Sequence, residues 1–494
     1  MLIAGFDPTP RADEPQSCAE AASQPSYLGC SFWPTAVANG VLPAFDFAVI
    51  VANLGSEPAE VTLTGPSTNQ HATVPSGTIR KLYLPWVDAL NPPGATCATT
   101  PELDASRLGK AAAFHLVSSR PVIASQWNPL QYRAVGLQKP DGEALCVSDC
   151  GSLDDCFSVS NDASLLLPDT ALTGSYRVTA HARGAGNYLA ITATQDQTTV
   201  TVTAGGRARI LPGEPGTGLV AMAPGESSTF VLDAGDVAEL VGDETYDRRV
   251  DLSASLVEAS APVQVITGDV CVRSPDKYPF SCDHIEELQL PLAAAGRRYL
   301  VTGVTGPAGD VVPHFVRLYG TVNGTALSFD PPLDGAPSAL DAGEVVNLGP
   351  VEGSFFVAGD APFLVATFQL SASFVDSQLS PELQRGDPSQ SIAIPVEGFR
   401  KRHVVIAPDD YESAFVDVAL PDGASLTVDG APSPVAPSPI GTSGFSVVHL
   451  PLSTLAGSAH TLVSDQPIGL QVVGYGRFTS YQIPGGTGSW YPIR

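Results

Sequence analysis

Alternation of apolar and polar residues dominates the chain and predicts short β-strands separated by tight turns. The run Thr198–Thr203 alternates threonine with valine, which is typical of a strand with one buried face and one wet face. Similar runs begin at Phe47, Phe315 and Ala414, with glycine, proline, asparagine or aspartate residues between them. Almost no helix is expected, apart from a single turn at 381–384.

One short phrase, an apolar strand closed by a proline, occurs three times. In each copy the residue that opens the next strand stands eight positions after the proline. The three pairs are Pro168 with Tyr176, Pro291 with Tyr299, and Pro395 with His403. Repetition of this kind predicts equivalent modules, in which the three prolines end equivalent strands.

A second landmark follows each copy and consists of a polar turn, a proline and an apolar strand. Its prolines are Pro262, Pro362 and Pro467, and Pro121 supplies a further copy upstream. Because proline cannot donate to a sheet ladder, we expect these prolines to begin equivalent strands, as in a hairpin of 252–257 with 263–266. Asn323-Gly324 between two apolar runs predicts another hairpin.

The last two modules each contain seven candidate strands in roughly 100 residues, the size of an immunoglobulin-like sandwich. A single sheet would leave one apolar face in water, so two packed sheets are expected in each module. The sequence therefore predicts an all-β, disulfide-containing protein of four tandem immunoglobulin-like β-sandwich modules. A β-propeller is the alternative, although a propeller blade of four short strands needs fewer residues than a module of this length contains. The predicted divisions are an extended arm at 1–26, module one at 27–139, a cysteine-rich acidic linker at 140–161, module two at 162–270, module three at 271–374 with a disulfide loop at its start, a linker at 375–390, module four at 391–486 and a tail at 487–494.

Length, composition and net charge exclude several classes of function. The chain has 494 residues, too many for one core, and 44% of them are apolar, so each module can bury its own core. The net charge of −26 argues against a nucleic-acid partner, whose phosphates need clustered lysine and arginine, and against binding to an anionic membrane surface. No apolar run reaches transmembrane length. Only five of the 25 basic residues are lysine, which fits a GC-rich bacterial genome.

The cysteines favour disulfides and an oxidising compartment, because their number is even and their contexts are loop-like. They are Cys18, Cys30, Cys97, Cys146, Cys150, Cys156, Cys271 and Cys282. We expect Cys271 to pair with Cys282, and Cys146 with Cys156 unless Cys150 competes. Zinc at the close trio is the alternative, but there is no Cys-x-x-Cys pair and no histidine nearby. The first residues do not form a signal peptide, so a removed leader is expected.

The sequence contains no recognisable catalytic motif. There is no Gly-x-Ser-x-Gly elbow, and the eight histidines lack metal-ligand spacing. His284 stands beside Asp283 and Glu286 and could be a ligand or a base, although a strand-edge position explains it better. Weak calcium candidates are Asp409, Asp410 and Glu412, which are more readily explained as a solvated turn. We therefore expect no enzymatic activity, no cofactor and no bound metal.

Longer motifs resemble a known family. Asn161–Pro168 with Tyr176, Asp283–Pro291 with Tyr299, and Gly386–Pro395 are similar to signatures of the IgGFc-binding protein N-terminal domain family, most closely its bacterial members. The resemblance covers roughly 27–486. Leu288-Gln-Leu-Pro291 and Ala294-Ala-Gly296 depart from the usual pattern at structural positions. The resemblance implies a secreted or surface-exposed all-β protein.

The expected function is that of an exported bacterial surface or extracellular protein, which presents its modules for adhesion, binding or assembly. The partner would be a protein or glycan at the cell surface, or a second copy of the chain. The alternatives are a self-assembling structural subunit of a fibre or coat, and a carbohydrate-binding or carbohydrate-active protein. Aromatic residues in the glycine-rich end of the chain are the candidate partner contacts, unless they cover the open end of module four: Tyr475, Phe478, Tyr481, Trp490 and Tyr491.

Overall fold

The structure is a computed structural model that describes residues 2–4, 14–41, 45–91, 103–135, 155–181, 186–244, 250–275, 282–452 and 459–488. Strands make up 52% of the residues and helices 5%, which confirms the all-β prediction. The helical segments are α1 (Cys18–Ser23), α2 (Ala372–Val375) and the 3₁₀ turns η1 (Asp169–Ala171), η2 (Leu292–Ala294), η3 (Pro381–Leu383) and η4 (Val396–Gly398). The turn expected at 381–384 is η3.

Four large sheets are each built on one long strand. In the second sheet, the first half of β17 pairs with β12 and β14, and the second half pairs with β13 and β18. The first sheet contains β1 (Leu2–Ala4), β2 (Gly29–Phe32), β3 (Phe47–Asn53), β4 (Ala59–Gly65), β5 (Thr68–Val74), β6 (Thr78–Leu84), the long β8 (His115–Asn128) and β11 (Asp162–Leu165). The second contains β7 (Arg107–Gly109), β12 (Thr173–Arg177), β13 (Asn187–Ala193), β14 (Thr198–Thr203), β15 (Ser227–Leu232), β16 (Val237–Val241), the long β17 (Leu256–Val272) and β18 (Asp283–Leu288).

The other two large sheets repeat this plan. The third contains β19 (Gly296–Val301), β22 (His314–Gly320), β23 (Thr325–Asp330), β24 (Ala339–Leu340), β25 (Val345–Val351), the long β26 (Phe355–Gln369) and β27 (Gln390–Ile392). The fourth contains β28 (Arg400–Ile406), β29 (Ser413–Pro421), β30 (Leu426–Val428), β31 (Ala431–Pro432), β32 (Ser438–Pro439), β33 (Phe445–Pro451), the long β34 (Ala459–Gly476) and β35 (Thr479–Pro484). Two small sheets pair β9 (Arg133–Val135) with β10 (Asp155–Phe157), and β20 (Val304–Thr305) with β21 (Val311–Val312).

The landmark prolines occupy equivalent positions, but they do not begin strands. Pro121, Pro262, Pro362 and Pro467 lie inside the long strands, where the register with the neighbouring strand shifts. The expected hairpin over Pro262 is therefore wrong. A proline fits at such a bulge because the ladder is interrupted there and no backbone N–H is required.

The residue eight positions after each repeat proline explains why that spacing recurs. The Tyr176 hydroxyl donates to the Val263 carbonyl at 2.7 Å, and the Tyr299 hydroxyl donates to the Phe363 carbonyl at 2.6 Å. In the fourth sheet, His403 Nε2 lies 3.0 Å from the Ile468 carbonyl oxygen. Each of these carbonyls belongs to the residue after a landmark proline. The side chain therefore contacts a backbone carbonyl group at the bulge, where buried backbone groups need hydrogen-bond partners.

The repeat prolines follow equivalent strands but do not end them. β11, β18 and β27 end three positions before Pro168, Pro291 and Pro395, and each proline precedes a 3₁₀ turn. These strands pair with the long strand of the preceding sheet rather than the following one. Sheet membership thus places 162–165 with the first sheet, although the repeat pattern suggests that this segment opens the second module.

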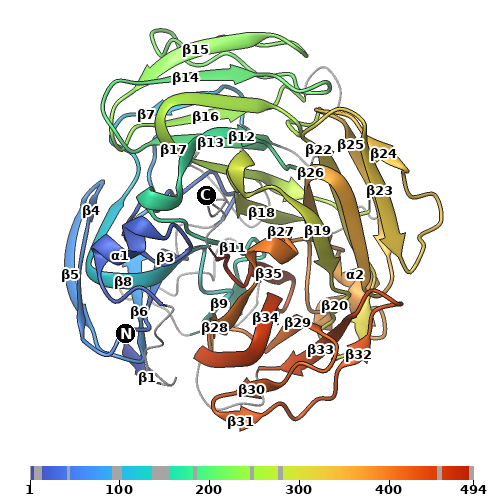
Figure 1. Ribbon diagram of the computed structural model, residues 1–494. Coiled ribbons are helices and arrows are strands. Elements are labelled where there is room, and N and C mark those ends of the chain that lie inside the picture. Colours follow the sequence, from blue (N-terminus) through green and yellow to red (C-terminus); the bar gives the residue numbers. More distant parts are fainter. Residues whose placement is uncertain are drawn as a thin grey trace.

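The four large sheets are arranged around a common centre (Figure 1). The strands β11, β18, β27 and β35 meet there, and each contacts the next around the centre. The fourth sheet also meets the first, because Arg402 donates to Glu14 at 2.8 Å and Lys81 donates to Asp409 at 2.8 Å. The sheets therefore form a closed ring, which the favoured prediction of tandem sandwich modules does not include.

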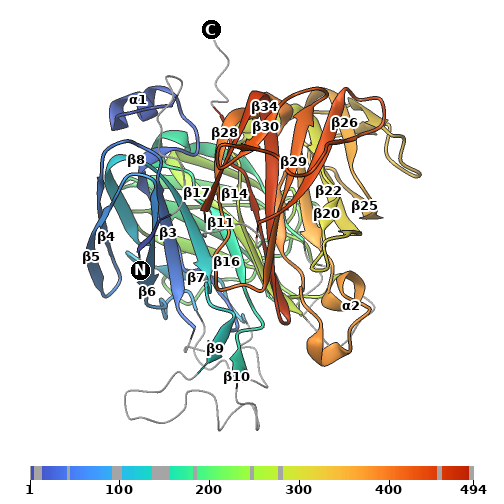
Figure 2. The same ribbon diagram turned by 90° about the horizontal axis from the view of Figure 1, so that it is seen from below.

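The expected extended arm at 1–26 contains ordered structure within its described part. Ser17 and Glu20 cap α1 reciprocally, since each side chain accepts from the backbone N–H of the other residue. A disulfide joins Cys18 to Cys30 and ties α1 to β2. Figure 2 shows α1 toward one end of the ring, whereas β9, β10 and α2 lie toward the other.

The hairpin expected at Asn323-Gly324 is also wrong. β22 and β23 flank this turn, but each pairs with a different half of β26 rather than with the other. Gly324 does adopt a positive φ of 69°. A two-residue turn of the predicted kind occurs instead at Asp429-Gly430, where φ is 50° and 79°, between the paired strands β30 and β31.

Candidate functional site

A single carboxylate, that of Asp162, joins the four central strands. Its oxygens accept the backbone N–H groups of Ala163 at 2.9 Å, Glu286 at 3.0 Å, Gln390 at 3.0 Å and Gln482 at 3.4 Å. These donors come from β11, β18, β27 and β35 respectively. Asp162 is fully buried, and desolvation holds its pKa well above the ordinary value despite these hydrogen bonds.

Further carboxyl groups surround Asp162 and are also buried. Glu286 accepts from Gln126 at 2.9 Å, from Asn128 at 2.9 Å and from Ser164 at 3.1 Å, and desolvation still raises its pKa to about 7. The other buried carboxyls near the centre are Asp283, Glu287 and Asp387. Desolvation also raises the pKa of Asp283, as does the nearby Asp387 carboxyl. The centre is therefore a polar core held mainly by neutral donors.

His284 lies in this core and not at an exposed edge. β18 is the innermost strand of its sheet, and the His284 ring is fully buried, with Nε2 at 2.8 Å from the Tyr188 hydroxyl. Burial lowers its pKa to about 3, so the imidazole is neutral at ordinary pH. A neutral, enclosed ring with a tyrosine partner has a packing role.

The calcium interpretation of Asp409, Asp410 and Glu412 is not supported. The ammonium group of Lys81 binds both aspartates, and the Tyr132 hydroxyl donates to Glu412 at 3.0 Å. The positive charge that a calcium ion would supply is thus provided by a lysine of the first sheet. Among the described residues, no group of three histidine, cysteine, aspartate or glutamate side chains could hold a metal ion.

Two clusters bring a hydroxyl, a histidine and a carboxylate together. The Ser31 hydroxyl donates to Asp169 at 2.6 Å and lies 2.9 Å from His115 Nε2, so the aspartate binds the serine rather than orienting the histidine. In the second cluster, the Thr305 hydroxyl and Asp417 both lie at Nδ1 of His449. In neither cluster do the hydrogen bonds run from a nucleophile to a base and from the base to a third group that orients it.

The structure joins Cys271 to Cys282, the pair expected from the loop between them. The expected pair Cys146–Cys156, its competitor Cys150, and Cys97 fall outside the residues whose side chains are described. Trp490 and Tyr491 also lie outside them.

Two of the predicted partner contacts are core residues. Tyr475 and Tyr481 are fully buried. The Tyr475 hydroxyl donates to the Thr305 carbonyl at 2.8 Å, and the Tyr481 ring packs 4.7 Å from that of Trp127. The neighbouring glycines create the space, because a Cβ on Gly474 would lie 2.0 Å from the Tyr481 ring.

Phe478 is half-buried and lies at the centre of what we term the arginine–aromatic face. Arg477 and Phe478 form the two-residue turn between β34 and β35. The Arg477 guanidinium lies 5.0 Å from the Phe157 ring centroid and 5.3 Å from that of Phe478, and the two rings meet edge to face. The face comprises Arg133, Phe157, Val159, Leu379, Leu383, Arg477 and Phe478.

Hydrogen bonds connect the segment before β27 to this turn. Arg477 Nε donates to the Glu382 carbonyl at 2.6 Å, and the Phe478 amide donates to the Gln384 carbonyl at 3.3 Å. The face lies at the end of the ring that carries β9, β10 and α2 (Figure 2). Val159 is 46% exposed and Leu383 is 53% exposed. The face therefore combines exposed apolar surface with arginine.

Backbone conformation distinguishes two residues of the face. Phe478 has a φ of 63° and Val159 a φ of 50°, which is the left-handed region that large and β-branched residues avoid. Each costs of order 1 kcal/mol or more, so the surrounding structure holds them against an intrinsic preference. Strained residues of this kind concentrate at functional sites.

These features define an all-β, disulfide-containing protein with an arginine-bearing apolar face at one end of the ring. The family described as IgGFc binding protein matches residues 162–474, from the start of β11 almost to the end of β34. The chain belongs to this family, whose members are extracellular binding proteins. No curated protein matches the chain. No helix within the described ranges is long and apolar enough to cross a membrane.

Proposed function

We propose that the chain is an exported bacterial surface protein that binds a protein partner through the arginine–aromatic face, in adhesion or surface assembly. The observation that carries the proposal is the pair of strained residues, Val159 and Phe478, which hold apolar side chains at the surface beside Arg477. Family membership supports a binding role outside the cell.

The chemistry of the face suits a protein interface. Tyrosine, tryptophan and arginine dominate the energetics of such interfaces, and stacked arginine loses little side-chain entropy on binding. Arg477 is already held between two rings and a backbone carbonyl, so it is preorganised. Because the chain carries 51 acidic against 25 basic residues, an arginine-bearing face selects partners with exposed carboxylates.

The substitution Phe478→Gly tests the proposal sharply. Glycine adopts a positive φ freely, so the turn should persist, and the melting temperature should hold or rise. A matched control is Val231→Ala, which trims a 49% exposed side chain on β15 of the second sheet. Partners would be isolated from the extracellular fraction with the wild-type chain, identified, and titrated against all three proteins by calorimetry.

We expect Phe478→Gly to weaken binding of the identified partner by at least about tenfold, since removal of an interface hot spot costs 2 kcal/mol or more. Val231→Ala should bind like the wild type. Equal affinity for Phe478→Gly and wild type would refute the proposed surface. Retention on glycan columns alone would favour the carbohydrate-binding alternative, and self-association without another partner would favour the structural one.

A further inference from the structure

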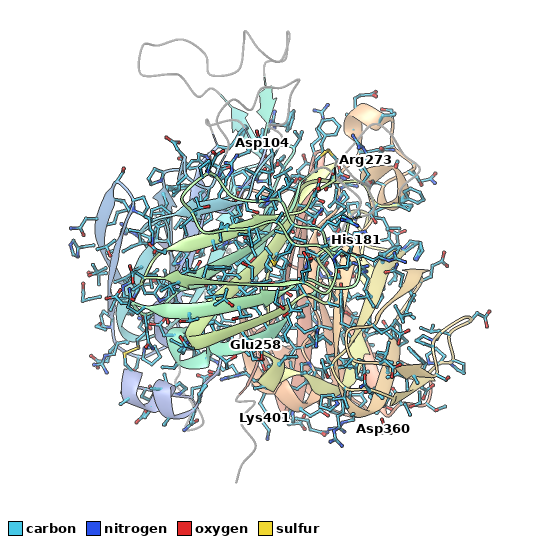
Figure 3. All side chains as sticks on the ribbon, turned by 90° about the horizontal axis from the view of Figure 1, so that it is seen from above. Asp104, His181, Glu258, Arg273, Asp360 and Lys401 are labelled. Atoms are coloured by element: carbon cyan, nitrogen blue, oxygen red, sulfur yellow. A yellow bond between two sulfur atoms is a disulfide. The ribbon has the colours of Figure 1, made fainter. Side chains whose placement is uncertain are left out.

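A polar cleft of about 310 Å³ lies between the second and third sheets. β22 and β25 line it from the third sheet, and the segments 206–207 and 251–254 line it from the second. His181, which packs on Phe315 and Phe368, lies where these sheets meet (Figure 3). The side chains that the cleft offers are Arg207, Asp251, Ser253, Arg317 and Asn347.

Arg317 forms the floor of the cleft and is held rigidly. Its guanidinium donates to Asp251 at 2.6 Å, to Asn347 at 2.6 Å and to Ser253 at 3.0 Å, and the side chain is only 4% exposed. The guanidinium of Arg317 lowers the pKa of Asp251 against the effect of burial, so this carboxylate is charged. Ala254 beside it has a φ of 62°, a further left-handed residue at this position.

The other groups of the cleft are available to a ligand. Arg207 is exposed at the mouth, and Asn347 uses its carbonyl oxygen for Arg317, which leaves the amide N–H groups to donate elsewhere. The lining thus carries two guanidinium groups against one carboxylate, in a chain whose net charge is −26. A local positive surplus on an acidic protein attracts an anion.

A third guanidinium group, that of Arg177, lies beside the cleft and supports an anionic ligand. Arg177 Nη1 donates to the Ala254 carbonyl at 2.9 Å and approaches Gly343, whereas its buried Nε–H has no partner among the described residues. Burial lowers the pKa of Arg177, and the charge of Glu258 opposes this shift. An anion in the cleft would supply further compensation for this partly buried cation.

We propose that this cleft binds an acidic sugar residue, with its carboxylate at Arg207 and Asn347 and its hydroxyl groups toward the Asp251 carboxylate. Carboxylates match the fork of a guanidinium, while sugar hydroxyls need both donors and acceptors, which this lining provides. The volume is at the low end of the range for ligand sites, which suits one monosaccharide unit. This site is separate from the arginine–aromatic face and does not depend on it.

Glucuronate, glucose and acetate are the probes, titrated into the whole chain by calorimetry and saturation-transfer NMR. Glucuronate should bind in the millimolar range or tighter. Glucose and acetate should bind at least about tenfold more weakly, because glucose lacks the carboxylate and acetate lacks the hydroxyl groups. Equal binding of glucose and glucuronate, equal binding of acetate and glucuronate, or no binding of glucuronate would overturn the proposal.

Three variants locate the site. Arg207→Ala should weaken glucuronate binding by about tenfold or more, and Arg207→Lys should be intermediate, because lysine keeps the charge but loses the fork. Arg297→Ala removes an exposed arginine of β19 and should leave affinity unchanged. Unchanged affinity in Arg207→Ala would refute the assignment. Phe478→Gly should bind glucuronate normally, so failure of the cleft and failure of the arginine–aromatic face are distinguishable.

Discussion

Replacement of the central Glu286 by glutamine should change how stability depends on pH. Glu286 is fully buried, and its pKa is raised from 4.5 to about 7. A folded pKa above the unfolded value means that the native state holds this proton more tightly. The resulting stabilisation is complete below the unfolded pKa and is lost as pH rises through the folded pKa. A shift of this size corresponds to roughly 3 kcal/mol.

The wild-type profile alone cannot isolate this contribution, because the buried histidines act in the opposite sense. Burial lowers the pKa of His284 to about 3 and those of His314 and His403 to about 4. Their stabilisation is present above the unfolded histidine pKa, which is about 6.5, and is lost as pH falls. The two sets of groups therefore oppose each other between about pH 4.5 and 6.5, and above this window only the raised carboxyls change.

The difference between the variant and the wild type removes the histidines from the comparison. At pH 4.5, Glu286→Gln should be the less stable protein, because its amide nitrogen replaces one of the two carboxyl oxygens. The nitrogen then faces either the Asn128 donor or the Gln126 and Ser164 donors. As pH rises to 8, the wild type should lose roughly 3 kcal/mol that the variant does not lose. Urea unfolding at four pH values measures this change.

The exposed substitution Glu352→Gln is the matched control and should track the wild type at every pH. A constant difference between Glu286→Gln and wild type from pH 4.5 to 8 would show that the Glu286 carboxyl does not bind its proton more tightly in the native state. The burial argument for the whole centre would then fail.

Three further substitutions test how the ring is held together. Cys271→Ser should lower the free energy of unfolding by about 3 kcal/mol, the loop-closure value for a loop of this size, and the same fall in Cys282→Ser would confirm the cause. Tyr299→Phe should lower the free energy of unfolding by about 2 kcal/mol, because the Phe363 carbonyl and the Gly296 amide lose a buried partner, and Tyr176→Phe should have the same effect. Unchanged stability in both variants would show that these hydroxyl groups do not stabilise the bulges. Lys81→Met should cost about 2 kcal/mol by removing the buried ammonium group that binds Asp410 and Asp409. Unchanged denaturant unfolding would mean that this contact does not close the ring.

The repeat was predictable because its cause is local. Pro168, Pro291 and Pro395 each precede a 3₁₀ turn, and the following strand begins after a fixed number of residues. The loop between Cys271 and Cys282 is likewise short and lacks a strand pattern, so the disulfide was visible in the spacing. Chain connectivity alone imposes these relations.

Some residues have partners far away in the chain that the sequence pattern does not reveal. Asp409 and Asp410 look like a solvated or calcium-binding turn until Lys81 of the first sheet reaches them. Tyr481 looks like an exposed aromatic residue in a glycine-rich segment, but Gly474 is the residue that makes room for its ring. Glycine beside an aromatic residue in a strand is a signal of close packing that could have been used.

The centre of the ring explains why a single chain is used rather than four copies of one module. The positions of Ala163, Glu286, Gln390 and Gln482 are equivalent in their strands, and all four donate a backbone N–H to Asp162. Four identical modules would place four carboxylates at this point, where like charges in a buried site repel strongly. Sequence divergence between the repeats within one chain permits a single carboxylate to accept hydrogen bonds from four equivalent backbone amides. The repeat is therefore regular in its backbone and necessarily irregular in its central side chains.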